Sequence, residues 1–121
     1  YEQICREPKY SAIANIGAVK EQMPRFFHEL PQILKNHQGT ARELLVDNQT
    51  VNEYREEHES RSHQIRVLPK EMYFASDVII GKNHLYMTSS GDRQISGVEI
   101  FSPTLRDTHQ AIFEQLWAMT V

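Results

Sequence analysis

The densest group of side chains that could do chemistry lies in the middle of the chain, where acids and histidines are concentrated. The group consists of Glu53, Glu56, Glu57, His58, Glu59 and His63. Carboxylates and imidazoles are common ligands of zinc and other divalent metals. Their spacing does not fit a metal site, because no HExxH motif occurs and the neighbours His58 and Glu59 point to different sides of a helix. We therefore expect a solvated helix face here, with no metal and no cofactor.

Nucleophilic catalysis also lacks its usual sequence signatures. Ser89, Ser90 and Ser96 have no GxSxG elbow around them, so no activated serine is indicated. The Gly81-Lys82 pair lacks the GxxxxGK[ST] frame of a phosphate-binding loop. The sequence therefore predicts no catalytic residues and a protein that is not an enzyme.

Three charged residues lie at the ends of apolar strands and form the candidate ligand site. They are Arg66 within HQIRVLP, Asp77 at the start of DVII, and Lys82 in the adjoining turn. Charges beside buried strands are costly unless they are paired. One interpretation is a structural ion pair between Arg66 and Asp77. The other is a cleft in which Arg66, Asp77 and Lys82 bind an anionic ligand or a partner.

The aromatic residues Phe113 and Trp117 lie four positions apart near the end of the chain, on the same face of an expected helix. Such residues belong either to the core or to an interface, because aromatic side chains are enriched at interface centres. Phe113 and Trp117 are therefore the candidate residues of a dimer interface.

Periodicity predicts the elements that must position these residues. Alternating or β-branched runs bounded by Gly, Pro, Asn and Asp indicate a strand with its exit turn over 10–19 and further strands at 40–46, 63–68, 77–80, 84–88 and 95–101. Apolar residues at spacings of three and four indicate helices over 21–34, with a break at Pro31, and over the last part of the chain. Segment 51–60 reads as a solvated helix, and Ser102 with Pro103 forms the start of the final helix.

The order β-α-β-α-β-β-β-β-α predicts an α/β fold, with one mixed β-sheet and helices packed on it. A chain of 121 residues fits a single domain, 1–121, with one core. The net charge of −3 gives no bulk attraction to the DNA backbone. Cys5 is the only cysteine, and no apolar run approaches the roughly 20 residues that span a bilayer. We expect a cytoplasmic protein with no membrane contact.

Most of the chain resembles the C-terminal domain of TrmB-like transcription regulators. The resemblance rests on HQIRVLPKE, SDVIIGKNHLYMTS and GVEIFSPTLRDTHQAIFEQLW between Arg61 and Trp117. The opening PKYSAIANIGAVKEQMPRFF looks like the strand, glycine and helix that enter that domain. The resemblance implies a phospholipase D-like fold and a regulatory domain that forms a homodimer and responds to a small-molecule effector. It also implies that DNA is contacted only through an N-terminal winged helix that these residues do not include.

Active phospholipase D-like enzymes carry an HxK motif on the strand before a hairpin like the one at 77–88. The corresponding stretch Met72–Val78 reads MYFASDV, without His or Lys, so the resemblance implies a non-catalytic member. The extra domain with which larger members bind sugars is not expected in a chain that ends at Val121. Two alternatives stay open: a phosphodiesterase or nuclease with His63 or His84 as nucleophile, and a free-standing protein-interaction module.

Overall fold

The computed structural model describes residues 9–16, 29, 39–74, 76–89 and 96–120. Within them, six strands form one mixed sheet in the order β3-β2-β1-β4-β5-β6. Their bounds are β1 Lys9–Ala14, β2 Thr40–Leu45, β3 His63–Val67, β4 Ser76–Ile80, β5 Leu85–Ser89 and β6 Ser96–Ile100. The expected α/β class, with helices on a mixed sheet, is confirmed.

The direction of the strands divides the sheet into two halves. β1, β2 and β3 run parallel, and helix α4 (Thr50–His58) lies in the connection between β2 and β3. Parallel neighbours require such a crossover, since a tight turn cannot bring the chain back to the same edge of the sheet. β4, β5 and β6 pair antiparallel with one another, and β4 pairs antiparallel with β1. The central pair β1 and β4 therefore joins a parallel half to a meander.

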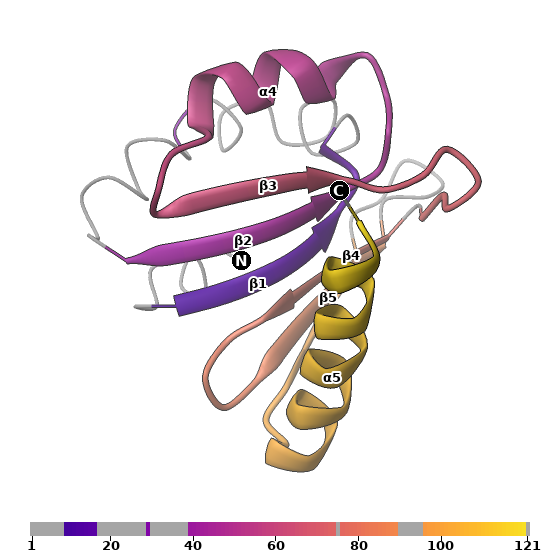
Figure 1. The fold of residues 1–121 in the computed structure, drawn as a ribbon. Helices are drawn as coiled ribbons and strands as arrows, with labels where there is room; N and C mark the ends of the chain where they lie inside the picture. Colours follow the sequence, from indigo (N-terminus) through magenta and orange to yellow (C-terminus); the bar gives the residue numbers. More distant parts are fainter. Residues whose placement is uncertain (1–8, 17–28, 30–38, 75, 90–95, 121) are drawn as a thin grey trace.

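The two described helices cover opposite faces of the sheet. Figure 1 shows α4 on one face and α5 (Pro103–Met119) on the other. α5 begins where the composition predicts, because the Ser102 hydroxyl accepts a hydrogen bond of 3.2 Å from the backbone N–H of Leu105 and Pro103 occupies the first turn. α4 places Val51, Tyr54 and His58 toward the sheet and its charged residues toward solvent.

Strand alternation separates the apolar residues into two clusters, one under each helix. The cluster on the α4 face contains Tyr10, Ala12, Ala14, Ile16, Ala41, Leu45, Val51, Tyr54, Ile65 and Ile79. The cluster on the α5 face contains Leu44, Val46, Leu68, Ile80 and Phe113, with Ile13, Met72, Val78, Leu116 and Trp117 packed against it. Both faces of the central strands are therefore buried, which explains the consecutive apolar residues Leu44-Leu45 in β2 and Val78-Ile79-Ile80 in β4.

The strands agree with the sequence expectation. In the segment 10–19, expected to hold a strand and its exit turn, β1 ends at Ala14 and Ile16 already has helical geometry. The backbone N–H of Asn15 donates a hydrogen bond of 2.9 Å to the Asp77 side chain, so the chain leaves the sheet at this point. The helix expected over 21–34 lies outside the described residues, apart from Glu29.

Candidate functional site

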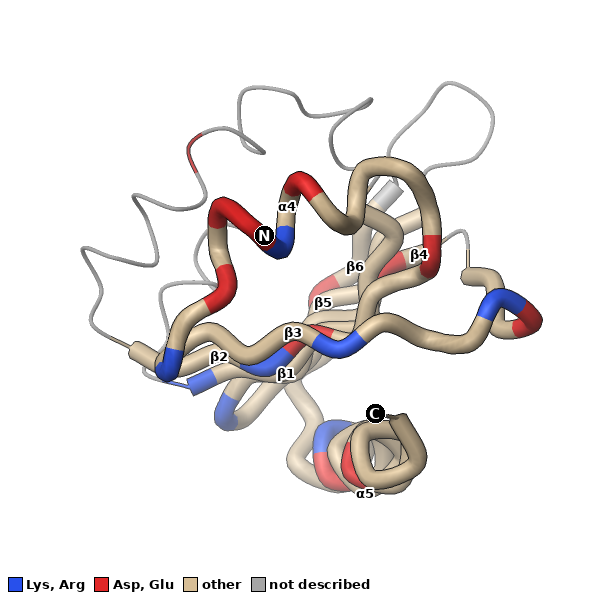
Figure 2. The backbone as a smooth tube through the Cα atoms, turned by 45° about the horizontal axis from the view of Figure 1, so that its top comes forward, with Lys and Arg blue, Asp and Glu red and all other residues tan. Residues whose placement is uncertain are grey.

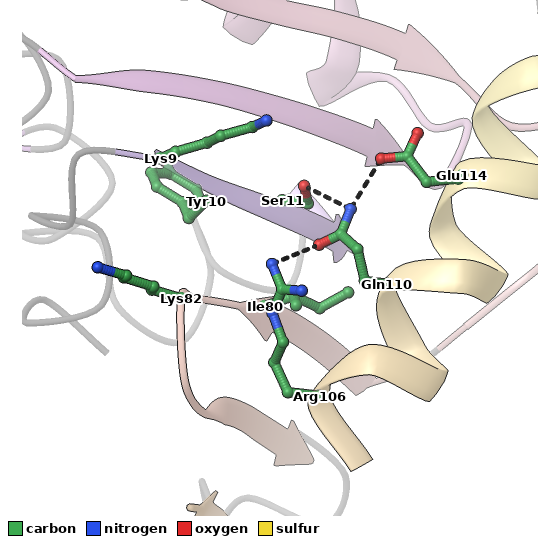
Figure 3. A pocket seen from close by; sticks show the side chains of 8 residues that line it. All are labelled: Lys9, Tyr10, Ser11, Ile80, Lys82, Arg106, Gln110 and Glu114. Carbon is green, nitrogen blue, oxygen red and sulfur yellow. Dashed lines mark hydrogen bonds between the residues drawn. The ribbon is translucent and has the colours of Figure 1, made fainter. Parts of the chain in front are cut away.

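A cavity of about 380 Å³ lies between α5 and the end of the sheet where β1 begins and β4 ends. Its lining consists of Lys9, Tyr10, Ser11, Ile80, Lys82, Arg106, Gln110 and Glu114. Figure 3 shows α5 presenting Arg106, Gln110 and Glu114 toward β1 and the end of β4. These three residues are spaced four apart, so they share one face of the helix. The size is within the range of small-molecule sites in proteins.

Hydrogen bonds fix the polar groups on the α5 side of this cavity (Figure 3). The Arg106 Nε donates to the carbonyl of Gly81 at 2.9 Å, and its Nη2 lies 3.5 Å from the Gln110 Oε1. The Gln110 Nε2 in turn donates to the Glu114 carboxylate at 2.9 Å and lies 3.4 Å from the Ser11 hydroxyl. Side chains held by neighbours lose less entropy on binding, so this wall is preorganised.

The Glu114 carboxylate is matched by Arg42, which lies next to the cavity on β2. Both guanidinium Nη atoms donate to Glu114, one of them at 3.0 Å. The hydrogen bond from Arg42 is the main reason why the pKa of Glu114 lies below its usual value. The Arg42 guanidinium also lies 5.1 Å from the Phe113 ring and 5.4 Å from the Trp117 ring. Glu114 is therefore an ionised, paired carboxylate.

A second cavity of about 240 Å³ adjoins the first along the starts of the parallel strands and shares Lys9 and Tyr10 with it. It is lined by Lys9, Tyr10, Thr40, Ala41, Arg42, Arg61, Ser62 and Gln64. Figure 2 shows basic positions gathered near this end of the sheet, whereas acidic positions are prominent on α4. A chain with a net charge of −3 therefore carries a locally basic region around both cavities.

The three residues of the predicted ligand cleft do not come together. Lys82 lines the larger cavity, in the turn that follows β4. Arg66 lies at the far end of α5, where it donates to the carbonyls of Trp117 and, at 3.0 Å, Thr120. Its guanidinium lies 4.2 Å from the Trp117 ring centroid. Arg66 therefore binds the carbonyl end of a helix, where cations are favourable.

The alternative ion pair between Arg66 and Asp77 is wrong, because the two side chains lie on opposite faces of the sheet. Asp77 lies two positions before Ile79 on β4, so both side chains are on the α4 face of the sheet, whereas Arg66 contacts α5 on the other face. Asp77 is buried, and its carboxylate accepts the hydrogen bond from the Asn15 backbone. This hydrogen bond fixes the backbone at Asn15, directly after β1.

The predicted dimer residues face inward. Phe113 is fully buried in the cluster under α5, and its ring stacks on Trp117 with centroids 5.7 Å apart. Trp117 is half-buried and packs against Arg42 and Arg66. The large apolar residues that α5 presents to solvent are instead Leu105, Ile112 and Met119.

A buried polar network lies under α4 and includes His58 and His63, so the expectation of a solvated helix face is wrong for these two residues of the acid and histidine group. The Glu43 carboxylate accepts a 2.6 Å hydrogen bond from the Tyr54 hydroxyl and contacts the His63 Nε2. The His58 ring stacks on Tyr54 at a centroid distance of 4.2 Å. This network joins β2, α4 and β3 inside the core.

Burial sets the ionisation of this network. Burial and the neighbouring His63 lower the pKa of His58 to about 4. For Glu43, burial raises the pKa, but the charge and hydrogen bond of His63 and the Tyr54 hydroxyl outweigh it, so the net direction is downward. We conclude that Glu43 is held as a carboxylate and His58 as a neutral ring at neutral pH.

Neither candidate nucleophile has an open approach. His63 is 5% exposed, and its Nε2 is directed at Glu43. The His84 Nδ1 lies 3.6 Å from the Glu99 carboxylate, and its ring packs edge-on against Phe101. These positions favour structural roles for both histidines.

Sequence reasoning missed most of the cavity residues, although one signal was present. Arg106, Gln110 and Glu114 lie at spacings of four in a segment read only for its apolar face. Lys9 and Ser11 lie two positions apart at the start of β1, where the sequence interpretation considered only the β-branched and small residues. The polar residues repeated along one face of the helix could therefore have indicated its side of the site. They could not have indicated which strand forms the other side.

Among the residues that the structure describes, no group of three His, Cys, Asp or Glu side chains could hold a metal ion. Neither α4 nor α5 has the length and apolar character needed to cross a bilayer. No protein-family model, no curated protein and no solved structure matches the chain.

Proposed function

We propose that this chain is the regulatory domain of a TrmB-like transcription regulator, with a phospholipase D-like fold in the order β-α-β-α-β-β-β-β-α. In this proposal it is cytoplasmic, forms a homodimer and responds to a small effector. DNA is contacted by an upstream winged helix. The resemblance that motivates the proposal covers β1, β3, β4, β5, β6 and α5.

The observation that carries the dimer is the outer face of α5. Leu105, Ile112 and Met119 are 44%, 51% and 75% exposed and recur every seven residues along the helix. A seven-residue repeat keeps these side chains on nearly one line, since two turns of an α-helix contain about seven residues. A repeated line of exposed apolar side chains, here with the exposed polar residues Thr108 and Gln115 between its members, is compatible with a surface that another helix covers.

The spacing of this line suits a second copy of the same helix. Leu105 and Met119 lie seven positions before and after Ile112, so an antiparallel copy pairs Ile112 with itself and Leu105 with Met119. Such a contact has the twofold symmetry of an isologous interface. The exposed small residues Ala111 and Ala118 flank the line and permit close approach of the helix backbones.

The charges on this face agree with the same arrangement. The exposed residues of α5 include only two charged side chains, Asp107 and Glu114. Glu114 is already paired with Arg42, and Asp107 lies 3.2 Å from an Nη of Arg106. A second copy therefore buries this surface without leaving the Glu114 carboxylate unpaired.

Sedimentation equilibrium of the whole chain tests this proposal. We expect a dimer at micromolar concentrations, and we expect Ile112→Glu to convert it to a monomer because two carboxylates would meet at the symmetry axis. Tyr73→Glu is the matched control, since Tyr73 is 68% exposed but lies in the segment between β3 and β4. A wild-type monomer throughout this range, or equal effects of both substitutions, contradicts a dimer built on α5.

DNA binding supplies the second part of the test. The isolated chain should show no retention of duplex DNA at physiological salt, because its net charge is −3. Salt-resistant, sequence-specific binding by these 121 residues would contradict the assignment of DNA contact to another segment.

A further inference from the structure

The larger cavity concentrates positive charge from three separate elements. Lys9 comes from the start of β1, Lys82 from the turn after β4, and Arg106 from the first turn of α5. The one carboxylate in the described lining, Glu114, is the partner of Arg42, and the exposed Asp107 outside the lining lies 3.2 Å from an Nη of Arg106. The described lining therefore has more positive than negative charge, although the protein as a whole is acidic.

The cavity also offers hydrogen-bond donors in fixed positions. Arg106 is oriented by the Gly81 carbonyl through Nε, so its planar guanidinium keeps one orientation at the wall. The buried Ser11 hydroxyl lies beside it, next to the Gln110 Nε2, which is already bonded to Glu114. Guanidinium groups recognise planar and tetrahedral oxyanions, and lysines add charge without strict geometry.

The remaining lining and the volume indicate the rest of the ligand. Tyr10 and Ile80 contribute apolar surface, and about 380 Å³ is far more than an inorganic ion requires, because one water molecule takes about 30 Å³. A ligand that fills this space has an apolar body as well as an acidic group.

We propose that this cavity binds a small organic anion, with its carboxylate or phosphate group at Arg106, Lys9 and Lys82 and its apolar body against Tyr10 and Ile80. This inference rests on the proposed function, in which such a molecule is the effector. The cavity and the exposed line of Leu105, Ile112 and Met119 lie on opposite sides of α5. An occupant that contacts Arg106 and Gln110 therefore contacts the helix that is proposed to form the dimer interface.

The site lies away from the segment that aligns with the catalytic motif of the enzymes. Met72–Val78 includes the start of β4, whereas Ile80 and Lys82 lie at and beyond its end. The proposed ligand site is therefore not the remnant of that catalytic centre.

Calorimetric titration of the whole chain with defined probes tests the inference. Phenyl phosphate and benzoate share an apolar ring and differ in the acidic group, so their relative affinities identify the preferred oxyanion. Benzyl alcohol supplies the ring without the charge, and inorganic phosphate supplies the charge without the ring. We expect one of the two organic anions to bind at least about tenfold more tightly than either of these controls, since both parts of the cavity then contribute.

Substitutions locate the binding. Lys9→Gln and Arg106→Gln should each weaken binding of the preferred probe by about tenfold or more, because each removes a charged partner. Lys70→Gln, at an exposed position after β3, is the matched control and should leave the affinity unchanged. Lys9 is exposed at the first position of β1, so its replacement keeps the test valid if the Arg106 variant fails to fold.

Several outcomes would overturn the inference. One is the absence of binding by both organic anions at millimolar concentration, and another is binding that Lys9→Gln and Lys70→Gln weaken equally. A third is displacement of the probe by duplex DNA at low salt, which would indicate a surface for a polyanion instead. The oligomer measured by sedimentation is independent of these results, so a dimer that binds no probe refutes the anion site alone.

Discussion

The Tyr54 hydroxyl donates a hydrogen bond of 2.6 Å to the Glu43 carboxylate within the core between α4 and the sheet. Tyr54 is fully buried and Glu43 is 4% exposed, so water cannot replace this partner. A buried carboxylate that loses a hydrogen-bond donor still carries the cost of its removal from water. The Tyr54 hydroxyl should therefore contribute more to the free energy of unfolding than an exposed hydroxyl does.

Tyr54→Phe should therefore lower the free energy of unfolding by about 1–3 kcal/mol, the usual cost of leaving a buried charged group short of one hydrogen bond. Urea denaturation followed by the fluorescence of Trp117, the one tryptophan in the chain, measures the change. Tyr73→Phe removes the same hydroxyl from an exposed ring and should change stability by less than about 0.5 kcal/mol. Equal losses in the two variants would show that the bond to Glu43 is not stabilising.

The buried ring of His58 predicts a dependence of stability on pH. Its pKa is about 4 in the folded chain and 6.5 in the unfolded chain, so the unfolded state binds the proton more readily between these values. The stability contributed by the neutral ring is present above pH 6.5 and is lost as the pH falls toward 4. The loss amounts to about 3 kcal/mol, since each pKa unit corresponds to about 1.4 kcal/mol.

Urea midpoints measured at intervals from pH 7.5 to pH 4.5 test this prediction. His58→Leu removes the titrating group and should flatten the curve over this range, whatever its effect on stability at pH 7. His109→Leu is the control, because His109 lies on α5 away from this network and should leave the slope unchanged. An identical slope in wild type and His58→Leu would assign the pH dependence to other groups.

The inward and outward faces of α5 should respond differently to truncation. Phe113→Ala removes a fully buried ring from the cluster between α5 and the sheet and should cost about 3–5 kcal/mol. The neighbouring Ile112→Ala should cost less than about 1 kcal/mol in dilute solution, where association contributes little. Chemical denaturation at low protein concentration compares them, and a larger loss for Ile112→Ala would mean that the helix is rotated.

The N-terminus of α5 depends on one hydroxyl. Ser102→Ala removes the acceptor of the hydrogen bond from the Leu105 backbone and should lower stability by about 1 kcal/mol. Thr104→Ala, two positions later, removes an exposed hydroxyl that does not cap the helix and should be neutral within about 0.5 kcal/mol. Thermal unfolding resolves this difference, and a neutral Ser102→Ala would show that Pro103 alone defines the start of the helix.

Strand positions could be predicted from sequence because alternation and turn residues are local signals. β2, β3, β4 and β5 lie within one or two residues of their expected bounds. The sequence could not show which side chains on different strands point to the same face of the sheet. Arg66 and Asp77 each stand at the correct place on a strand, but β2 and β1 separate their strands in the sheet. Whether two side chains share a face then depends on the register of every intervening pair.

The candidate site shows the same limit. Lys82 could be selected from sequence because it stands in a turn between two apolar runs. Lys9 and Arg106 are almost a hundred residues apart, and only the packing of α5 beside β1 and β4 brings them to one cavity. Phe113 and Trp117 illustrate the converse, since an aromatic pair on a terminal helix is compatible with a core or an interface until the opposite face of that helix is known.

The position of Glu43 among apolar neighbours also bears on how the chain selects its native strand alignment. Leu44 and Leu45 follow Glu43, so a β2 strand shifted by one residue would still bury apolar side chains on both faces of the sheet. It would, however, carry the Glu43 carboxylate to the α5 side, away from Tyr54 and His63. Misaligned pairings thus incur an unpaired charge in the interior, so Glu43 favours the native register of the parallel half of the sheet over registers shifted by one residue.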